Sequence, residues 1–327
     1  MSPAQITPFG TTATGQDVAC VTLNGHGLTV AIITKGATLQ SVRLAGVDHD
    51  LTLGSNSLAD YEGEMRHHGS LVAPVVNRFK GATAPIDGKL RMFEANQDGK
   101  HTLHCGAAGT QHKVWNVVEA NDTAVTLAVD LPDGEGNMPG NRHVTARFSL
   151  HQGARLHLEV TATTDARTLF NAANHSYWNL DGSASWAGHS LQIAASSYLP
   201  TDDDFCVTGE IADVSGTPMD FRRGRKITPA DTVLDHNFCL SAGRQALRDV
   251  LWLTGANGLM MTVATTEPGI QLFDARSAQR TGGPTYEGLA IEAQNWPDAP
   301  NHQSFPSIEL EAGATCVQVT EWRFSRA

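Results

Sequence analysis

Apolar and polar residues alternate in short runs along most of the chain, and this period of two leaves few folds open. A strand with one face on a core and the other in solvent has this pattern, whereas an amphipathic helix repeats about every 3.6 residues. Glycine, asparagine and aspartate separate the runs, as they do in hairpin turns. The clearest runs form three pairs around such turns: 28–34 with 39–44, 113–119 with 123–130, and 143–150 with 155–163.

Runs of the same kind continue towards the C-terminus, whereas helical patterns are scarce. Residues 232–238 and 244–250 each fit a single helical turn and no more. The sequence has no internal repeat, low-complexity tract or linker that would divide it. We therefore predict an all-β protein with few short helices, a large antiparallel β-sandwich that forms one domain over residues 1–327.

The charge balance narrows the partners that the protein can have. Asp and Glu number 34 against 23 Lys and Arg, and the formal net charge is −11. An acidic chain without an extended basic surface suits neither nucleic acid nor an anionic membrane. The basic run FRRGRK at 221–226 is short and fits a solvated loop. We predict neither a nucleic-acid partner nor a membrane partner.

Cysteine usage and the N-terminal residues indicate the compartment. The five cysteines stand far apart without a CxxC pair, which argues against a disulfide framework. The N-terminal MSPAQITPFGTT has neither the basic nor the apolar region of a signal peptide. No apolar run approaches the roughly 20 residues that a membrane helix needs. These features together predict a cytoplasmic protein. The cysteines are Cys20, Cys105, Cys206, Cys239 and Cys316.

Two histidines stand in segments that could carry chemistry. His104 precedes a glycine turn in LHCG at 103–106, and His175 lies among polar and aromatic residues in NHSYWNL at 174–180. Either histidine fits a structural role at a strand end. Either also fits proton transfer, because an imidazole held by a polar neighbour titrates near neutral pH. Aromatic faces such as Tyr177 and Trp178 suit the C–H faces of sugars as well as a packed core.

Three further polar positions have a structural and a functional reading. Glu292 ends an apolar strand, where a carboxylate costs energy unless it has a partner or a task. Asp235, in DHNF, can cap a turn or bind hydroxyl groups. Arg78, next to Asn77 in NRFKG, can pair with an acid or hold a ligand oxygen by charge-assisted hydrogen bonds. The residues alone do not decide between these readings.

Other common site patterns are absent from the sequence. The adjacent His67 and His68 lack the HxH or HExxH spacing of a zinc site, so we predict no metal. The sequence also lacks a GxSxG motif, a phosphate-binding glycine loop and a dinucleotide fingerprint. No cofactor is expected from the sequence.

Seven stretches, taken together and in this order, resemble the aldose 1-epimerases, or galactose mutarotases. Each stretch is weak alone, but together they span nearly the entire chain. The resemblance implies a galactose mutarotase-like supersandwich, a large antiparallel β-sandwich with an open, cofactor-free cleft for a monosaccharide. The stretches are NRFKG (77–81), LHCG (103–106), NHSYWNL (174–180), GTPMDFR (216–222), DHNF (235–238), EPGIQLF (267–273) and IEAQNWPD (291–298).

The resemblance also implies roles for single residues. Glu292 matches the general base of the family, His175 its general acid, and His104 the second histidine of the active site. Sequence cannot separate the roles of the two histidines. The positions that match substrate-binding residues are Arg78, Asp235 and Gln271, and Asn77 matches a further polar position in the same cleft.

Two departures from the family pattern lie near the expected cleft. Where members commonly read GRxxNR, this chain reads APVVNR at 73–78, so one arginine is absent. After Gln271 the usual YTGN is replaced by FDAR at 273–276. Both leave the chemistry in place but leave the sugar open: a hexose, a deoxyhexose or a pentose, in pyranose or furanose form.

The function predicted from the resemblance is an isomerase that interconverts the α and β anomers of a free aldose by acid–base ring opening and closure, with or without pyranose–furanose exchange. The alternatives are a non-catalytic carbohydrate-binding sandwich and a hexose-6-phosphate 1-epimerase. A glycoside hydrolase or lyase needs paired catalytic carboxylates, which only Glu292 with Asp235 could mimic. The oligomeric state cannot be read from the sequence.

Overall fold

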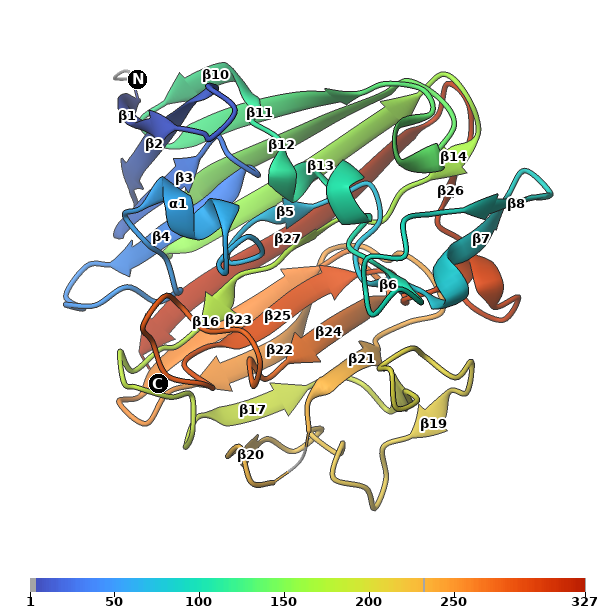
Figure 1. Ribbon diagram of the computed structural model, residues 1–327. Coiled ribbons are helices and arrows are strands. Elements are labelled where there is room, and N and C mark those ends of the chain that lie inside the picture. Colours follow the sequence, from blue (N-terminus) through green and yellow to red (C-terminus); the bar gives the residue numbers. More distant parts are fainter. Residues whose placement is uncertain (1–3, 232, 327) are drawn as a thin grey trace.

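The computed structural model describes residues 4–231 and 233–326, and antiparallel strands dominate its regular secondary structure (Figure 1). Two large sheets and one smaller sheet account for most strands. The prediction of an all-β fold with few short helices is confirmed.

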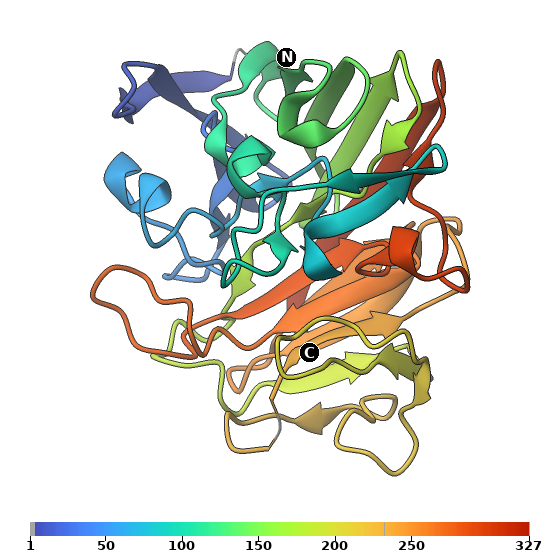
Figure 2. The same ribbon diagram turned by 45° about the vertical axis from the view of Figure 1, so that its right-hand side comes forward.

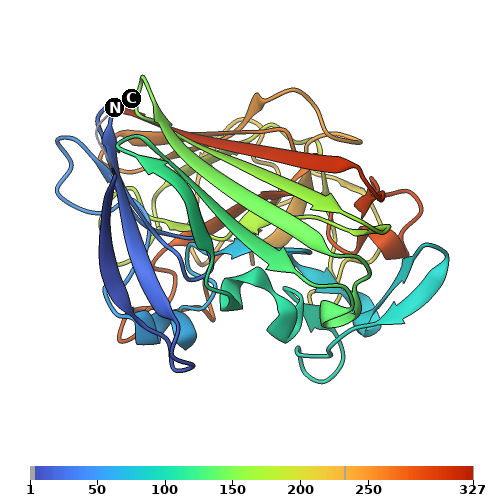
Figure 3. The same cartoon turned by 90° about the horizontal axis from the view of Figure 1, so that it is seen from above.

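The largest sheet has nine antiparallel strands, which form one broad curved layer (Figure 3). It contains the second and third hairpins expected from the alternating pattern, paired residue by residue through β10–β11 and β12–β13. Its strands, in spatial order, are β10 (Asn116–Asn121), β11 (Ala124–Leu131), β12 (Arg142–His151), β13 (Arg155–Thr164), β27 (Thr315–Arg326), β23 (Leu259–Thr265), β22 (Arg248–Thr254), β17 (Ser190–Ile193) and β20 (Arg225–Lys226).

The second sheet has six strands and carries three of the polar residues described below, Asp235, Gln271 and Glu292. Alternate residues of its central strands face the hydrophobic core, among them Ile270, Leu272 and Ile291. Its strands, in spatial order, are β16 (Tyr177–Trp178), β25 (Leu289–Gln294), β24 (Gly269–Phe273), β21 (Asp235–Cys239), β18 (Ser197–Leu199) and β19 (Ala212–Asp213).

The N-terminal region forms a four-stranded sheet of β1 (Gln5–Thr11), β2 (Asp17–Gly25), β3 (Leu28–Ile33) and β4 (Thr38–Leu44), in which β3–β4 is the first predicted hairpin. Four two-stranded pairs complete the sheets: β5 (Leu71–Val72) with β15 (Ala173–Asn174), β6 (Arg78–Phe79) with β9 (Thr102–Leu103), β7 (Thr83–Ile86) with β8 (Lys89–Met92), and β14 (Thr168–Leu169) with β26 (Glu309–Leu310).

Helices are short. The described residues contain one five-residue α-helix, α1 (Leu58–Glu62). The 3₁₀ turns are η1 (Lys80–Ala82), η2 (Gly106–Ala108), η3 (Thr110–His112), η4 (Glu135–Asn137) and η5 (Ala299–Asn301). Over the same residues, no helix is long and apolar enough to cross a membrane.

One large hydrophobic core joins the three sheets. It combines the inner faces of the nine-stranded, six-stranded and four-stranded sheets, and its cluster runs from Val21 to Phe324. Trp178 on β16 packs against Trp322 on β27, with ring centroids 5.7 Å apart. Since burial of apolar surface is the main favourable term in folding, this shared core fixes the six-stranded sheet against the nine-stranded one.

The two helical turns expected from the sequence are wrong. Residues 235–239 form β21, which pairs with β24, and residues 248–254 form β22, which pairs with β23. Thr232 lies outside the described residues. The strands form because backbone pairing within the sheets, with β24 for β21 and with β23 and β17 for β22, overrides a weak local helical preference.

Candidate functional site

Three neighbouring strands of the six-stranded sheet carry the polar groups of a cleft. Gln271 on β24 pairs directly with Glu292 on β25, and Asp235 on β21 lies on the same face. Successive strand residues point to opposite faces of a sheet. The alternate residues of these strands therefore point into the core, whereas Asp235, Gln271 and Glu292 point away from it. Strand alternation alone therefore gathers two carboxyl groups and an amide on one surface.

Glu292 is almost fully buried, with 2% of its surface exposed. Its Oε1 lies 3.5 Å from Nε2 of His175, and its Oε2 has no hydrogen-bond partner among the described residues. Burial raises the pKa of Glu292 well above its usual value; Asp235 raises it further and Arg78 opposes the rise. This carboxyl therefore has a strong affinity for a proton.

His175 is held by the strand pairing on either side of it. Its backbone N–H donates to Ser70 O at 2.9 Å, and its carbonyl accepts from Gly69 N at 3.0 Å. Asn174 strengthens the same connection, since its side-chain Nδ2 donates to Gly69 O at 2.7 Å. Burial lowers the pKa of His175 to about 4, and its buried Nδ1 has no hydrogen-bond partner among the described residues. The backbone pairing around His175 thus fixes the residue with Nε2 beside Glu292 and Nδ1 unpartnered.

His175 and Glu292 form a coupled pair. Burial favours the uncharged form of each, so the pKa of the acid rises while that of the imidazole falls. Such neighbours titrate as a unit, and a single proton bound by the pair can lie on either group. A short transfer within the pair converts the neutral form into carboxylate and imidazolium.

His104 is positioned differently. It lies in a tight turn at φ 53°, followed by Cys105 at φ 60°. The backbone N–H of Asn77 donates to His104 Nδ1 at 3.1 Å, and His104 N donates to Asn77 O at 2.9 Å. Because Nδ1 accepts this bond, the ring hydrogen must be on Nε2. Burial lowers the pKa of His104, so the residue is a neutral hydrogen-bond donor rather than a proton reservoir.

Arg78 and Asp235 form a partly buried ion pair that faces the cleft. Arg78 Nη2 donates to Asp235 Oδ2 at 3.1 Å, and Arg78 Nε donates to Gln97 Oε1 at 2.9 Å. Gln271 Nε2 donates to the other carboxylate oxygen, Asp235 Oδ1, at 2.7 Å. The centroid of the Phe205 ring lies 5.8 Å from Cζ of the Arg78 guanidinium. These contacts fix both charges in one orientation, ready to meet hydroxyl groups.

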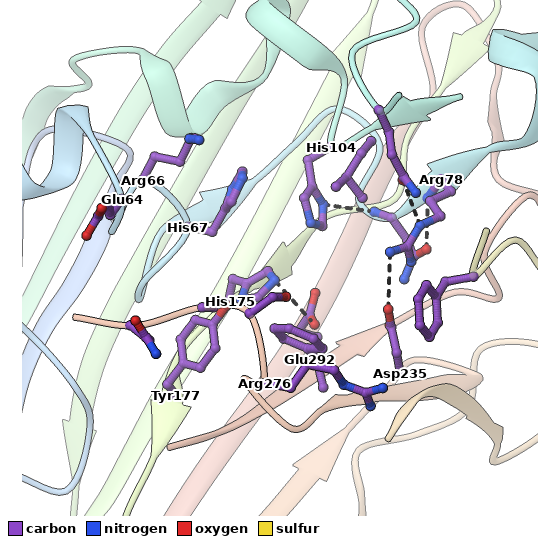
Figure 4. Close-up of a pocket in the computed structure, with 18 of the residues that line it drawn as sticks. Glu64, Arg66, His67, Arg78, His104, His175, Tyr177, Asp235, Arg276 and Glu292 are labelled. Atoms are coloured by element: carbon purple, nitrogen blue, oxygen red, sulfur yellow. Dashed lines mark hydrogen bonds and ion pairs between the residues drawn. The ribbon is translucent and has the colours of Figure 1, made fainter. Parts of the chain in front are cut away.

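These groups surround a cleft of about 570 Å³ (Figure 4). The cleft lies between the six-stranded sheet and the segment that contains β6 and β9, which Figure 2 shows beside β24 and β25. Six of the seven residues singled out in the sequence line it. Gln271 does not line the cleft and instead holds Asp235 from the side.

Several lining residues could not be found from the sequence. They are His67, Gln97, Phe205 and Arg276, together with Tyr177, whose role was left open. His67 was considered only as half of a metal pair, and the structure shows no group of three or more metal-binding side chains in the described ranges. The basic run at 221–226 is not part of the cleft lining: Arg222 bonds to Asp220, and Arg225 packs over Phe221.

Comparison with known proteins agrees with this geometry. The family model described as aldose 1-epimerase matches residues 19–323. The galactose mutarotase of Homo sapiens is 32% identical over 317 residues, covering 92% of each chain. The aldose 1-epimerase of Escherichia coli K12 is 31% identical over 333 residues, covering 95% of this chain and 96% of that protein.

Solved structures show the same fold. The aldose epimerase homologue from C. elegans superposes with a TM-score of 0.88 at 28% identity, covering 95% of this chain and 99% of that one. The galactose 1-epimerase from Lactobacillus acidophilus superposes with a TM-score of 0.86 at 26% identity, and each chain is covered completely. The predicted galactose mutarotase-like supersandwich is therefore confirmed.

Proposed function

This chain belongs to the aldose 1-epimerase family, and we propose that it interconverts the α and β anomers of a free aldose with Glu292 as base and His175 as acid. The family match and the identity to named mutarotases over more than nine-tenths of the chain support the activity, which makes the protein an isomerase. The observation that carries the assignment of roles is the 3.5 Å contact between His175 Nε2 and Glu292 Oε1.

That contact suits the reaction because both oxygens that exchange protons are bonded to the same sugar carbon, C1. An acid and a base must therefore stand side by side, as these two groups do. The single proton that His175 and Glu292 share is bound to His175 when ring opening starts. General acid or base assistance of this kind typically contributes about 10²–10⁴-fold in rate.

Ring opening then needs two proton transfers. Glu292 takes the proton of the C1 hydroxyl, the C1–O5 bond breaks, and His175 gives its proton to O5. The product is the open-chain aldehyde, with a neutral imidazole and a protonated carboxyl. Rotation about C1–C2 presents the other face of the carbonyl, and the reverse transfers close the ring to the other anomer. Every proton that leaves or reaches the sugar is transferred to Glu292 or from His175 during opening, and in reverse during closure.

The remaining lining residues hold the sugar while C1 turns. Arg78 and Asp235 offer paired donors and acceptors for ring hydroxyls, and Gln271 keeps Asp235 in place. His104 donates from Nε2 towards the ring oxygen or a neighbouring hydroxyl, and Asn77 fixes that ring through its backbone N–H. For the roles that the sequence could not separate, we propose that His175 exchanges a proton and that His104 donates a hydrogen bond.

We further propose that the protein acts as a single domain over its length and works in the cytoplasm. The shared core of the three sheets supports the first proposal. All five cysteines are free thiols, as expected in a reducing compartment, which supports the second.

The test is a screen of free aldoses by polarimetry and exchange NMR, including pentoses and sugars that form furanoses. Faster exchange between anomers than in buffer alone is the expected result. Binding of sugars without any acceleration would instead identify a carbohydrate-binding sandwich. Acceleration confined to hexose 6-phosphates would identify the phosphorylated sugar as substrate.

A further inference from the structure

The polar groups of the cleft form a closed ring around one space. His175 contacts Glu292, Glu292 pairs across the strands with Gln271, and Gln271 bonds to Asp235. Asp235 bonds to Arg78. The ring closes through the turn of His104, whose imidazole lies 5.3 Å from that of His175, centroid to centroid.

A pyranose surrounded by these polar groups can be oriented from the order of the atoms in the sugar ring, given the roles proposed above. With O1 at Glu292 and O5 at His175, carbons C2 and C3 lie towards Asp235, because they follow C1. Carbon C4 then lies towards Arg78. Carbon C5, bonded to O5, is left facing the gap between His104 and His175.

His67 lies at that gap. Its ring centroid is 4.8 Å from that of His104 and 5.8 Å from that of His175, so the three imidazoles surround one end of the cleft (Figure 4). Its backbone carbonyl accepts from the backbone N–H and from the hydroxyl of Ser70, which holds the segment beside β5. The buried Nδ1 of His67 has no hydrogen-bond partner among the described residues. A polar ring placed in this way has unused bonding capacity beside the site.

We propose that His67 is a further substrate-contacting residue, which hydrogen-bonds the hydroxyl of the C5 substituent and so selects aldohexoses with a free C6 hydroxyl over 6-deoxyhexoses and pentoses. The inference rests on the proposed function, since that function orients the sugar.

The chemistry of the His67 imidazole favours a neutral hydroxyl group as its hydrogen-bond partner. Burial and the neighbouring His175 hold the pKa of His67 well below its usual value, so the ring is uncharged at neutral pH. A neutral imidazole has one donor and one acceptor, which matches a hydroxyl group that also has both. A phosphate or carboxylate at C6 would instead require a cation.

The experiment measures kcat/KM for anomer exchange on three sugars with the same configuration at C2 to C4: D-galactose, 6-deoxy-D-galactose and L-arabinose. The wild type is compared with His67→Phe, which keeps a ring without hydrogen bonds, and with His67→Gln, which keeps a donor and an acceptor. His112→Phe is the matched control, since His112 does not line the cleft. Repeating the series with D-glucose, 6-deoxy-D-glucose and D-xylose covers a different C4 configuration.

The wild type should prefer the hexose over its 6-deoxy form by about tenfold, the usual contribution of one hydrogen bond. His67→Phe should abolish that preference while activity on the 6-deoxy sugar stays within about threefold, and His67→Gln should retain part of it. An unchanged preference in His67→Phe would overturn the inference, as would an equal loss on all three sugars, which would show that His67 supports the acid–base pair instead. If the wild type accelerates exchange of no aldose, the proposed function fails, and the inference fails with it.

Discussion

The two walls of the cleft are built in different ways. One wall carries Asp235 and Glu292, and Gln271 on the strand between them supports Asp235 from the side. The three residues stand on adjacent strands with ordinary extended backbone. Their spacing is set by the sheet, whose strands lie about 4.8 Å apart, and their direction is set by alternation. This wall is rigid because the opposite face of the same strands is the hydrophobic core.

The other wall consists of turns. Asn77 has φ 68°, His104 φ 53° and Phe205 φ 59°, a left-handed conformation that L-residues with bulky side chains rarely adopt. Such backbone persists only where surrounding contacts enforce it, and it concentrates at functional sites. Here the enforcing contacts are the Asn77–His104 pair and, around Phe205, the backbone N–H groups of Asp204 and Cys206, which donate to Asp202 Oδ1 at 3.1 and 3.0 Å.

The difference suggests a division of labour. The strand wall carries the proposed base, Glu292, and the proposed sugar-binding carboxylate, Asp235. The turn side carries the proposed neutral donors, His67 and His104. We therefore expect a change at Glu292 to affect the chemical step most, a change at Asp235 to affect binding, and changes on the turn side to affect which sugar is accepted.

The largest expected effect is that of Glu292→Gln on the strand wall. Removing the base without changing its size should lower kcat by about 10²–10⁴-fold and leave KM within a few-fold. Polarimetry at saturating sugar measures both constants. Glu309→Gln, at an exposed position on β26, is the control. Turnover close to that of the wild type would remove Glu292 from the role of base.

The second prediction compares the two histidines. Glutamine keeps a donor near the position of Nε2 but cannot donate a proton as an acid. His175→Gln should therefore lower kcat by about 10²-fold or more, whereas His104→Gln should lose only about tenfold. Equal losses in the two variants would contradict the separate roles, and thermal midpoints would show that both variants fold.

Asp235→Asn should have a smaller effect, mainly on binding. It removes the charge opposite Arg78, and loss of a charge-assisted hydrogen bond costs about 1.5–3 kcal/mol, or roughly 10–100-fold in kcat/KM. Most of the loss in kcat/KM should come from a higher KM for anomer exchange. Asp249→Asn breaks an exposed aspartate–arginine pair with Arg323 and should leave both constants unchanged. A fall in kcat alone would place Asp235 in the chemical step.

The smallest expected effect concerns pH and stability. Burial lowers the pKa of His68 to about 3, while an unfolded histidine titrates near 6.5. Between these values the unfolded chain binds the additional proton, so the free energy of unfolding falls as pH falls, by about 1.4 kcal/mol per pH unit for this residue.

His68→Phe preserves the stacking on Tyr177, whose ring centroid is 4.1 Å away, and removes the titration. Denaturant unfolding at several pH values between about 4 and 6 should give a shallower slope for the variant. Identical slopes would show that His68 takes up no additional proton on unfolding.

The strand wall was largely accessible to sequence reasoning, and the turn wall was not. Alternation predicted the hairpins and singled out Glu292 as a carboxyl group on an apolar strand, which needs an explanation. The predicted end of that strand at Glu292 was wrong, because β25 continues to Gln294. Which strands become neighbours depends on the tertiary structure, so 232–238 and 244–250 were misread as helical turns.

The turn wall depends on φ angles and tertiary contacts that leave no periodic signal. His104 and Arg78 were found through family motifs rather than through their spacing. His67 gave no usable signal, because its relation to His104 and His175 exists only in the folded chain. Phe205 could not be found either, because its contact with Arg78 joins segments more than a hundred residues apart.

The shared proton of His175 and Glu292 has a thermodynamic consequence. Each turnover returns the pair to the state in which it began, whichever anomer is released, so the cleft has no preferred direction. It cannot shift the proportions that the two anomers reach in water; it only shortens the time needed to restore them. The benefit of such a catalyst arises when another process withdraws a single anomer faster than water alone can replace it.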